Sequence, residues 1–125
     1  MNLLLDTHVL LWWLDDNPTL SEKARIVIPD PENLVLISAA VIWEIRIKQS
    51  IGKLDIPRNF RNILYREPFE LLDITADHAH AVGDLPAYHR DPFDRMLVAQ
   101  AKVEGLNLMT RDARMKQYGI PIIEV

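Results

Sequence analysis

Residues 34–48 read LVLISAAVIWEIRIK, a stretch that joins a short apolar run to a helical pattern. The run at 34–37 has the length and composition of a buried strand. Ser38 is a favoured N-cap residue, so we predict that a helix begins there and ends near Gly52. A strand that passes directly into a helix is the repeating unit of α/β proteins with a parallel sheet.

The same alternation continues on both sides of this stretch. Other apolar runs predict strands at residues 3–5, 69–72, 106–109 and 120–125. The segments between them predict helices at residues 10–14, 21–28, 58–66, 75–83, 91–104 and 111–117. We therefore predict an α/β fold, with a central parallel sheet flanked by helices, that residues 1–125 form as a single domain. In such sheets, ligands bind beyond the carboxyl ends of the strands.

The composition is that of an ordinary globular protein. Apolar residues make up 49% of the chain and charged residues 26%, which argues against disorder. Cysteine is absent, so disulfides and thiolate metal sites are excluded. The apolar N-terminal run lacks the basic region and cleavage site of a signal peptide, and no run is long enough to span a membrane. We expect a soluble, cytoplasmic protein without a membrane partner.

The net charge of −4 alone argues against a nucleic-acid partner, because phosphate binders are usually basic. The charges are nevertheless segregated along the chain. Residues 44–66 contain six basic groups and two acids, whereas residues 67–94 contain seven acids and one base. A basic face and an acidic pocket are compatible with this pattern, and so are solvated helix faces.

Glu44 stands between Trp43 and Ile45 in the predicted helix, where burial of a carboxylate is costly unless it is paired or binds a cation. One interpretation is an ion pair with Lys48, one helical turn further on, which would add only ~0.2–0.5 kcal/mol. The other interpretation is that Glu44 faces a ligand site.

Three aspartates lie at or shortly after the edge where a ligand would bind. Asp6 directly follows the first predicted strand, Asp112 follows the fourth, and Asp94 lies in the first turn of the helix that begins at Asp91. Taken singly, each fits a turn or a helix cap. Together with Glu44 they would converge on one crevice, and two carboxylates ~5 Å apart repel by roughly 3 kcal/mol at an effective dielectric of about 20. Such an all-oxygen pocket suits Mg²⁺ or Mn²⁺ and phosphodiester hydrolysis.

Four segments together resemble the motifs of PIN-domain ribonucleases. They are LLLDTHVLLWWL at 3–14, ISAAVIWEIRIKQSIGKL at 37–54, HRDPFDRMLVAQA at 89–101 and LMTRDARMKQYGI at 108–120. The residues of these motifs are most similar to those of VapC toxins of type II toxin–antitoxin modules. None of the four acidic positions departs from the family pattern.

The resemblance implies a small sandwich of helices around a parallel sheet and Mg²⁺- or Mn²⁺-dependent cleavage of RNA. It implies that the catalytic, metal-binding acids are Asp6, Glu44, Asp94 and Asp112, with accessory positions at Asp91, Thr7 and Thr110. It also implies a homodimer that a cognate VapB-like antitoxin inhibits, with DNA bound only through the antitoxin.

Basic residues near these acids are candidates for contacts with the RNA backbone. We rank Arg95 and Arg111 highest because each adjoins a predicted site acid, and we add Arg46 and Lys48 from the Glu44 helix.

Aromatic residues and histidines in the same motifs have two interpretations. Trp43 and Phe93 are suited to stacking on bases, but core or dimer packing is the interpretation that we favour. We interpret His8 and His89 as structural histidines with satisfied hydrogen bonds.

Two alternative functions remain open. The first is a PIN-fold protein that binds an antitoxin but does not cut RNA. The second is a receiver-like signalling domain, whose length and alternation of elements are similar. A receiver domain would carry adjacent acids after the first strand and a lysine at a later strand end, where this chain has only Asp6 and the pair Thr110-Arg111.

Overall fold

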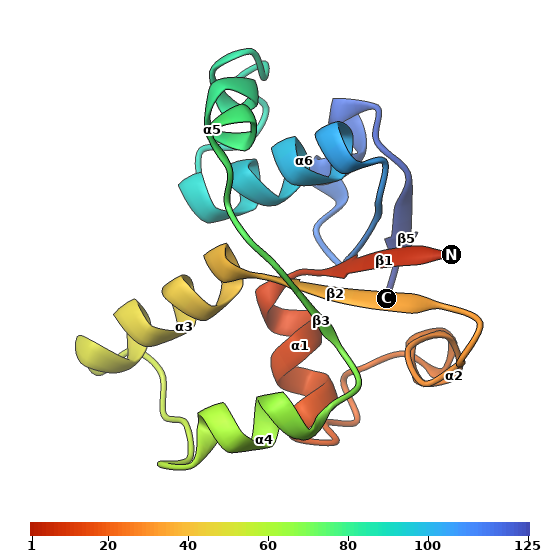
Figure 1. Ribbon diagram of the computed structural model, residues 1–125, viewed down its shortest axis with the longest axis vertical. Helices are drawn as coiled ribbons and strands as arrows, with labels where there is room; N and C mark the ends of the chain where they lie inside the picture. Colours follow the sequence, from red (N-terminus) through yellow and green to blue (C-terminus); the bar gives the residue numbers. More distant parts are fainter.

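The computed structural model describes residues 1–125, which form a five-stranded sheet with helices on both faces (Figure 1). The strands are β1 (Asn2–Leu5), β2 (Leu34–Ser38), β3 (Glu70–Leu72), β4 (Asn107–Thr110) and β5 (Ile122–Glu124). The α-helices are α1 (Thr7–Leu14), α2 (Glu22–Val27), α3 (Ala39–Ser50), α4 (Phe60–Arg66), α5 (Ala76–Gly83) and α6 (Pro92–Glu104), and η1 (Ala113–Tyr118) is a 3₁₀ helix. All strand pairs are parallel, so the predicted α/β fold is confirmed.

The strand order is β3-β2-β1-β4-β5, which places β1 at the centre of the sheet. Leu3 of β1 lies opposite Val35 of β2, and Leu4 lies opposite Leu108 of β4. Figure 1 shows α5 and α6 on one side of the sheet and α1 and α4 on the other. Because both faces of β1 are covered, Leu3, Leu4 and Leu5 are completely buried, which explains why this strand is a continuous apolar run.

Two helices begin differently from the prediction, and in both cases an aspartate caps the helix. The helix predicted to start at Leu10 already begins at Thr7, because the Asp6 side chain accepts the Val9 N–H at 2.9 Å. The short helix predicted at 111–117 is the 3₁₀ helix η1, which begins at Ala113 and is capped by Asp112. Each capping aspartate is thereby fixed at the carboxyl end of a strand.

The strand order brings the carboxyl ends of β2, β1 and β4 side by side. Asp6 follows β1, Asp112 follows β4, and α3, which carries Glu44, follows β2 without a loop. The fold therefore collects residues from distant parts of the sequence at one edge. None of the helices combines the length and the apolarity that crossing a membrane would require.

Candidate active site

A cleft of about 420 Å³ lies at this edge, and its lining is almost entirely polar. It contains five carboxylates against three lysine or arginine side chains, which leaves two negative charges in excess when the histidines are neutral. Its lining residues are Asp6, Thr7, His8, Trp12, Glu44, Lys48, His89, Asp91, Asp94, Arg111, Asp112 and Arg114. The structure thus places all four predicted catalytic acids in one cleft.

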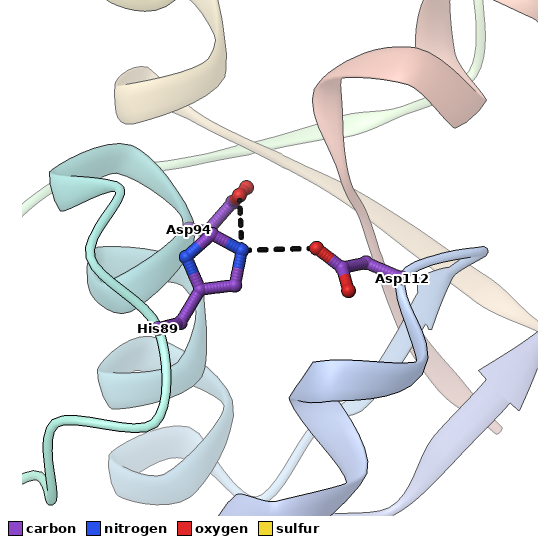
Figure 2. Close-up of side chains that lie close together, drawn as sticks. All are labelled: His89, Asp94 and Asp112. Carbon is purple, nitrogen blue, oxygen red and sulfur yellow. Dashed lines mark hydrogen bonds and ion pairs between the residues drawn. The ribbon is translucent and has the colours of Figure 1, made fainter.

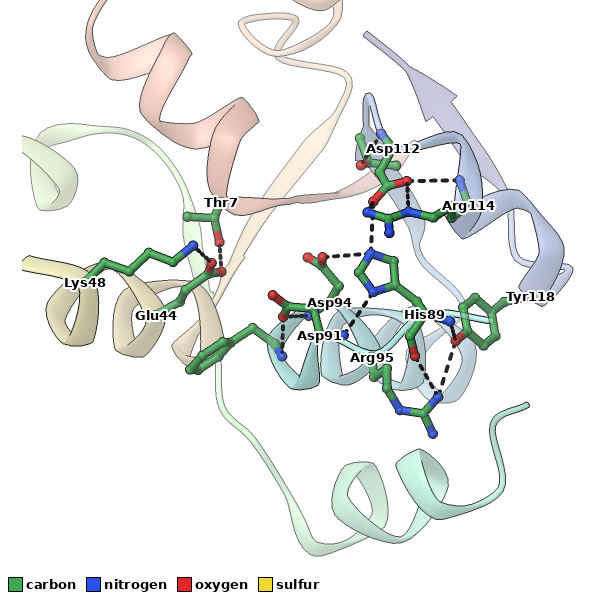
Figure 3. A network of polar contacts seen from close by, with 12 residues as sticks. Thr7, Glu44, Lys48, His89, Asp91, Asp94, Arg95, Asp112, Arg114 and Tyr118 are labelled. Atoms are coloured by element: carbon green, nitrogen blue, oxygen red, sulfur yellow. Dashed lines mark hydrogen bonds and ion pairs between the residues drawn. The ribbon is translucent and has the colours of Figure 1, made fainter. Parts of the chain in front are cut away.

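Glu44 is buried on α3, and both of its carboxylate oxygens have partners (Figure 3). Thr7 Oγ1 donates to Oε1 at 2.6 Å, and Lys48 Nζ donates to Oε2 at 2.5 Å. The hydrogen bond to Glu44 raises the pKa of Lys48, because the carboxylate stabilises the charged ammonium. The predicted ion pair with Lys48 is confirmed, and Glu44 also lines the cleft, so its role as a ligand stays a prediction.

Asp6 and Asp94 form no salt bridge with a lysine or arginine. Burial raises the pKa of Asp6 above its ordinary value. Burial also raises the pKa of Asp94 to about 7, and the neighbouring carboxylate of Asp91 adds to this rise. Each of these two acids is therefore ionised at a cost that a bound cation would remove.

Asp112 has the opposite environment. Arg114 donates from Nε to Oδ1 at 3.0 Å and from Nη2 to Oδ2 at 2.8 Å, which is a two-point contact (Figure 3). The Arg114 backbone N–H also donates to Oδ1, at 3.0 Å. These bonds, with Arg114 foremost, hold the pKa of Asp112 well below its usual range.

His89 lies between two of the acids. Its Nε2 is 2.9 Å from Asp112 Oδ2 and 3.2 Å from Asp94 Oδ2 (Figure 2). These three side chains place potential ligand atoms within 4.8 Å of one another, a group that does not include Asp6 or Glu44. His89 is buried and hydrogen-bonded, as predicted, but the sequence did not indicate that its ring would separate two site acids.

Two of the predicted accessory residues, Asp91 and Thr110, hydrogen-bond to the backbone at or next to the site acids. Asp91 Oδ1 caps α6 by accepting the Phe93 and Asp94 N–H groups at 2.8 and 3.1 Å. Thr110 is buried, lies outside the lining of the cleft, and accepts the Asp112 N–H at 3.0 Å. These contacts fix the backbone at Asp94 and Asp112.

The predicted RNA-contacting residues divide into two groups. Lys48 and Arg111 line the cleft, and the Arg111 guanidinium lies 4.6 Å from the centre of the Trp12 ring. Arg46 and Arg95 do not line it. Adjacency to an acid succeeded for Arg111 but misled for Arg95, because Arg95 follows Asp94 within α6 and consecutive helical residues point about 100° apart.

Arg95 instead holds the segment before α6 in place. Its guanidinium donates to the Tyr118 hydroxyl and to four backbone carbonyls, those of Val82, Leu85, Pro86 and His89. The group is thus occupied within the protein, which does not support the predicted role of Arg95 in substrate binding.

Sequence reasoning missed Arg114, which pairs with Asp112 and lines the cleft. The only available signal was its position two residues after a predicted site acid. Trp43 is 58% exposed and meets Phe93 edge-to-face, with ring centres 5.2 Å apart. Trp43 is therefore a surface residue, so the core interpretation was wrong for it and dimer packing stays a prediction.

The family model of the PIN domain matches residues 3–121 of this chain. The chain belongs to the PIN-domain family. Over 122 residues it is 31% identical to Ribonuclease VapC22 of Mycobacterium tuberculosis, covering 94% of this chain and 92% of that protein.

The strand order excludes the receiver-domain alternative. The order β3-β2-β1-β4-β5 of this chain differs from the 2-1-3-4-5 order of receiver domains.

Solved structures share the fold of this PIN domain. VapBC2 from Rickettsia felis, bound to a promoter DNA fragment, contains a chain with a TM-score of 0.74 and 16% identity, covering 99% of this chain and 98% of that one. DNA-bound VapBC from Salmonella typhimurium gives a TM-score of 0.72 and 19% identity, with coverage of 99% and 98%.

The cleft of this PIN domain fits a divalent cation. Its acids offer oxygen ligands, and its excess of two negative charges matches the charge of one such ion. Burial without a cationic partner raises the pKa values of both Asp6 and Asp94. A bound cation would supply the missing partner.

Proposed function

We propose that this PIN domain, residues 1–125, is a divalent-metal-dependent endoribonuclease and the toxin of a type II toxin–antitoxin module. The observation that carries the proposal is the convergence of acids from four separate motifs on one polar cleft. The 31% identity to a protein named as a ribonuclease supports RNA as the substrate class. Action on RNA would place the protein in the cytoplasm.

The ion that we assign to the cleft is Mg²⁺ or Mn²⁺, because the carboxylates are hard oxygen ligands. Asp94 and Asp112 would hold it directly, with Asp6 and Glu44 completing the site. When bound, such an ion supplies an activated water at neutral pH and positive charge at the reacting phosphate.

The residues of the chain orient the reactants around this centre. Thr7 and Lys48 each bind one oxygen of Glu44, so the rotation of this carboxylate is restricted. Arg114 exposes 63% of its side chain at the rim, and Arg111 lies on the Trp12 ring. We assign the Nη1 group of each guanidinium to the RNA phosphates, because Arg111 already donates from Nε and Nη2 to the Val125 and Thr19 carbonyls, and Arg114 from Nε and Nη2 to Asp112.

The partners that we propose are a cognate VapB-like antitoxin and a second copy of this chain. The VapBC complexes among the structural neighbours support the first. Two of these complexes are bound to DNA, and for this chain we propose that DNA is bound only through the antitoxin. The exposed Trp43 and its neighbour Phe93 form an apolar surface of the type that homodimers bury.

The test is cleavage of total cellular RNA by the purified protein, freed of antitoxin, in Mg²⁺, in Mn²⁺ or in EDTA. Asp94→Asn is the test variant, and Asp84→Asn, an exposed aspartate outside the cleft, is the matched control. We expect discrete fragments that require metal, disappear in Asp94→Asn and persist in Asp84→Asn. Cleavage that survives Asp94→Asn would refute the site. A folded wild type that binds antitoxin but cuts no RNA would favour the binding-only alternative.

A further inference from the structure

We propose that His89 is a positioning residue, which holds Asp112 beside Asp94 through its Nε2–H group and stays outside the metal's ligand set. The inference rests on the proposed metal-dependent function and refines its metal site. It explains how two acids from separate elements are held close together before an ion arrives. It also makes the site one of oxygen ligands only.

The ring of His89 is fixed from several directions. The residue is 5% exposed, and its Nδ1 accepts the Asp91 backbone N–H at 3.0 Å. Its own N–H donates to the Tyr118 hydroxyl at 2.9 Å, and its carbonyl accepts from Arg95 Nη1 at 3.3 Å. A side chain held at both its backbone and its ring has little freedom to rotate.

The Asp91 contact also determines which ring nitrogen carries the hydrogen. A backbone N–H can only donate, so Nδ1 must present its lone pair and a neutral ring carries its hydrogen on Nε2. This N–H donates to Asp112 Oδ2 at 2.9 Å, and Nε2 also lies 3.2 Å from Asp94 Oδ2 (Figure 2). A nitrogen that carries a hydrogen has no lone pair to offer a metal.

The N–H of His89 lies next to both carboxylates but is hydrogen-bonded to one of them. Asp94 comes from the first turn of α6 and Asp112 from the residue before η1, so no common element holds them. The hydrogen bond fixes Asp112 Oδ2, and the positive end of the same N–H, 3.2 Å from Asp94 Oδ2, offsets part of the repulsion between the two acids. The side-chain oxygens of Asp94 accept no hydrogen bond and stay available for a cation.

The competing arrangement has His89 as a direct ligand. Its Nε2 belongs to the same close group as the two acids, and a site of one histidine and two carboxylates would suit Zn²⁺. That arrangement requires Nε2 to lose its hydrogen and the Asp91 N–H to lose its acceptor. The hydrogen bonds of the ring therefore favour the positioning role.

The test compares three variants of the full chain. His89→Leu removes the donor, His89→Gln keeps an N–H donor, and His80→Leu is the matched control at an exposed histidine of α5. Binding of Mn²⁺ to the metal-free protein is followed by electron paramagnetic resonance of the free ion, and circular dichroism checks folding. We expect His89→Leu to weaken Mn²⁺ binding about 10–100-fold, because residues that orient ligands have effects of this size. His89→Gln should recover most of the affinity, and His80→Leu should match the wild type.

A spectroscopic measurement on the wild type covers the case in which His89→Leu fails to fold. Long-range ¹H–¹⁵N correlation in histidine-labelled protein distinguishes the two ring nitrogens, and His89→Gln assigns the signal. We expect a bare Nδ1 and a protonated Nε2, both before and after Mg²⁺ is added. Loss of the Nε2 hydrogen with metal, or wild-type Mn²⁺ affinity in a folded His89→Leu, would overturn the proposal.

The wild type separates failure of this proposal from failure of the proposed function. If the wild type itself neither binds Mn²⁺ nor cuts RNA, the proposed function fails as well. If the wild type does both and His89→Leu is unaffected, only the role of His89 fails.

Discussion

Two pairs of acids line the same cleft, and they differ in how their charge is balanced. Glu44 has Lys48 Nζ at 2.5 Å, and Asp112 has Arg114 Nη2 at 2.8 Å. Asp6 and Asp94 have no lysine or arginine partner, and burial raises the pKa of both. We call Glu44 and Asp112 the neutralised pair and Asp6 and Asp94 the unneutralised pair.

The difference indicates a division of labour. The neutralised pair is negatively charged and oriented before any ion arrives, because its partners belong to the protein. The unneutralised pair is ionised at a cost in free energy that an external cation would remove. Four acids that look equivalent as sequence motifs therefore contribute to metal binding in two different ways.

The largest expected effect is on catalysis by the unneutralised pair. Asp6→Asn keeps the shape of the side chain but removes its charge, so we expect kcat/KM to fall by about 10²–10³-fold. The measurement is steady-state cleavage of an RNA oligonucleotide that contains a cut found in total RNA. A loss of less than about tenfold would show that Asp6 is not a metal-binding acid.

Lys48→Met would convert Glu44 into an unneutralised acid. We expect the free energy of unfolding to fall by about 2 kcal/mol, because a buried carboxylate is left without its cation. Urea denaturation measures this loss, with Lys53→Met at an exposed lysine as control. Added Mg²⁺ should recover part of the lost stability. Equal stability of the two variants would mean that Lys48 does not balance Glu44.

When the metal is removed with EDTA, neutralising one acid of each pair should shift the melting temperature in opposite directions. Asp94→Asn relieves repulsion and should raise the melting temperature, whereas Asp112→Asn loses its pairing with Arg114 and should lower it. Each change is expected to be about 1 kcal/mol, or roughly 3–5 °C for a chain of this size. Thermal unfolding by circular dichroism gives both values. Shifts of the same sign would remove the distinction between the pairs.

The pH dependence of stability should be the smallest effect. The folded-state pKa of Asp94 is about 7 and its ordinary value is 3.8, so the folded protein binds the extra proton between these values. Stability from this group is therefore complete below pH 3.8 and is lost as the pH rises through about 7. In EDTA, the melting temperature should fall more between pH 5 and pH 8 in the wild type than in Asp94→Asn. An equal fall in both would contradict the raised pKa.

Much of the fold follows from local signals. The apolar run of β1 and the cap at Ser38 predict the strand-to-helix alternation, since burial on both faces and capping are local requirements. The Glu44–Lys48 pair was also accessible, because a spacing of four residues places both side chains on one face of a helix.

The charge balance of the remaining acids was not accessible from the sequence. His89 approaches Asp112 from a segment that Arg95 and Tyr118 help to hold, and Arg95 itself was misassigned on adjacency alone. The two-point contact of Arg114 is made from the first turns of the 3₁₀ helix η1, and the sequence predicted a short helix there without its type. These are tertiary contacts, and sequence motifs do not encode their geometry.

The most direct test of the central claim, that the unneutralised acids take a divalent cation, is a calorimetric Mg²⁺ titration of the metal-free protein at pH 6. Two buffers with different ionisation enthalpies report how many protons binding releases. We predict proton release in the wild type, because Asp94, with a pKa of about 7, must ionise to bind the ion. Asp94→Asn should bind weakly and release less. Wild-type binding without proton release, together with unchanged affinity in Asp94→Asn, would contradict the account.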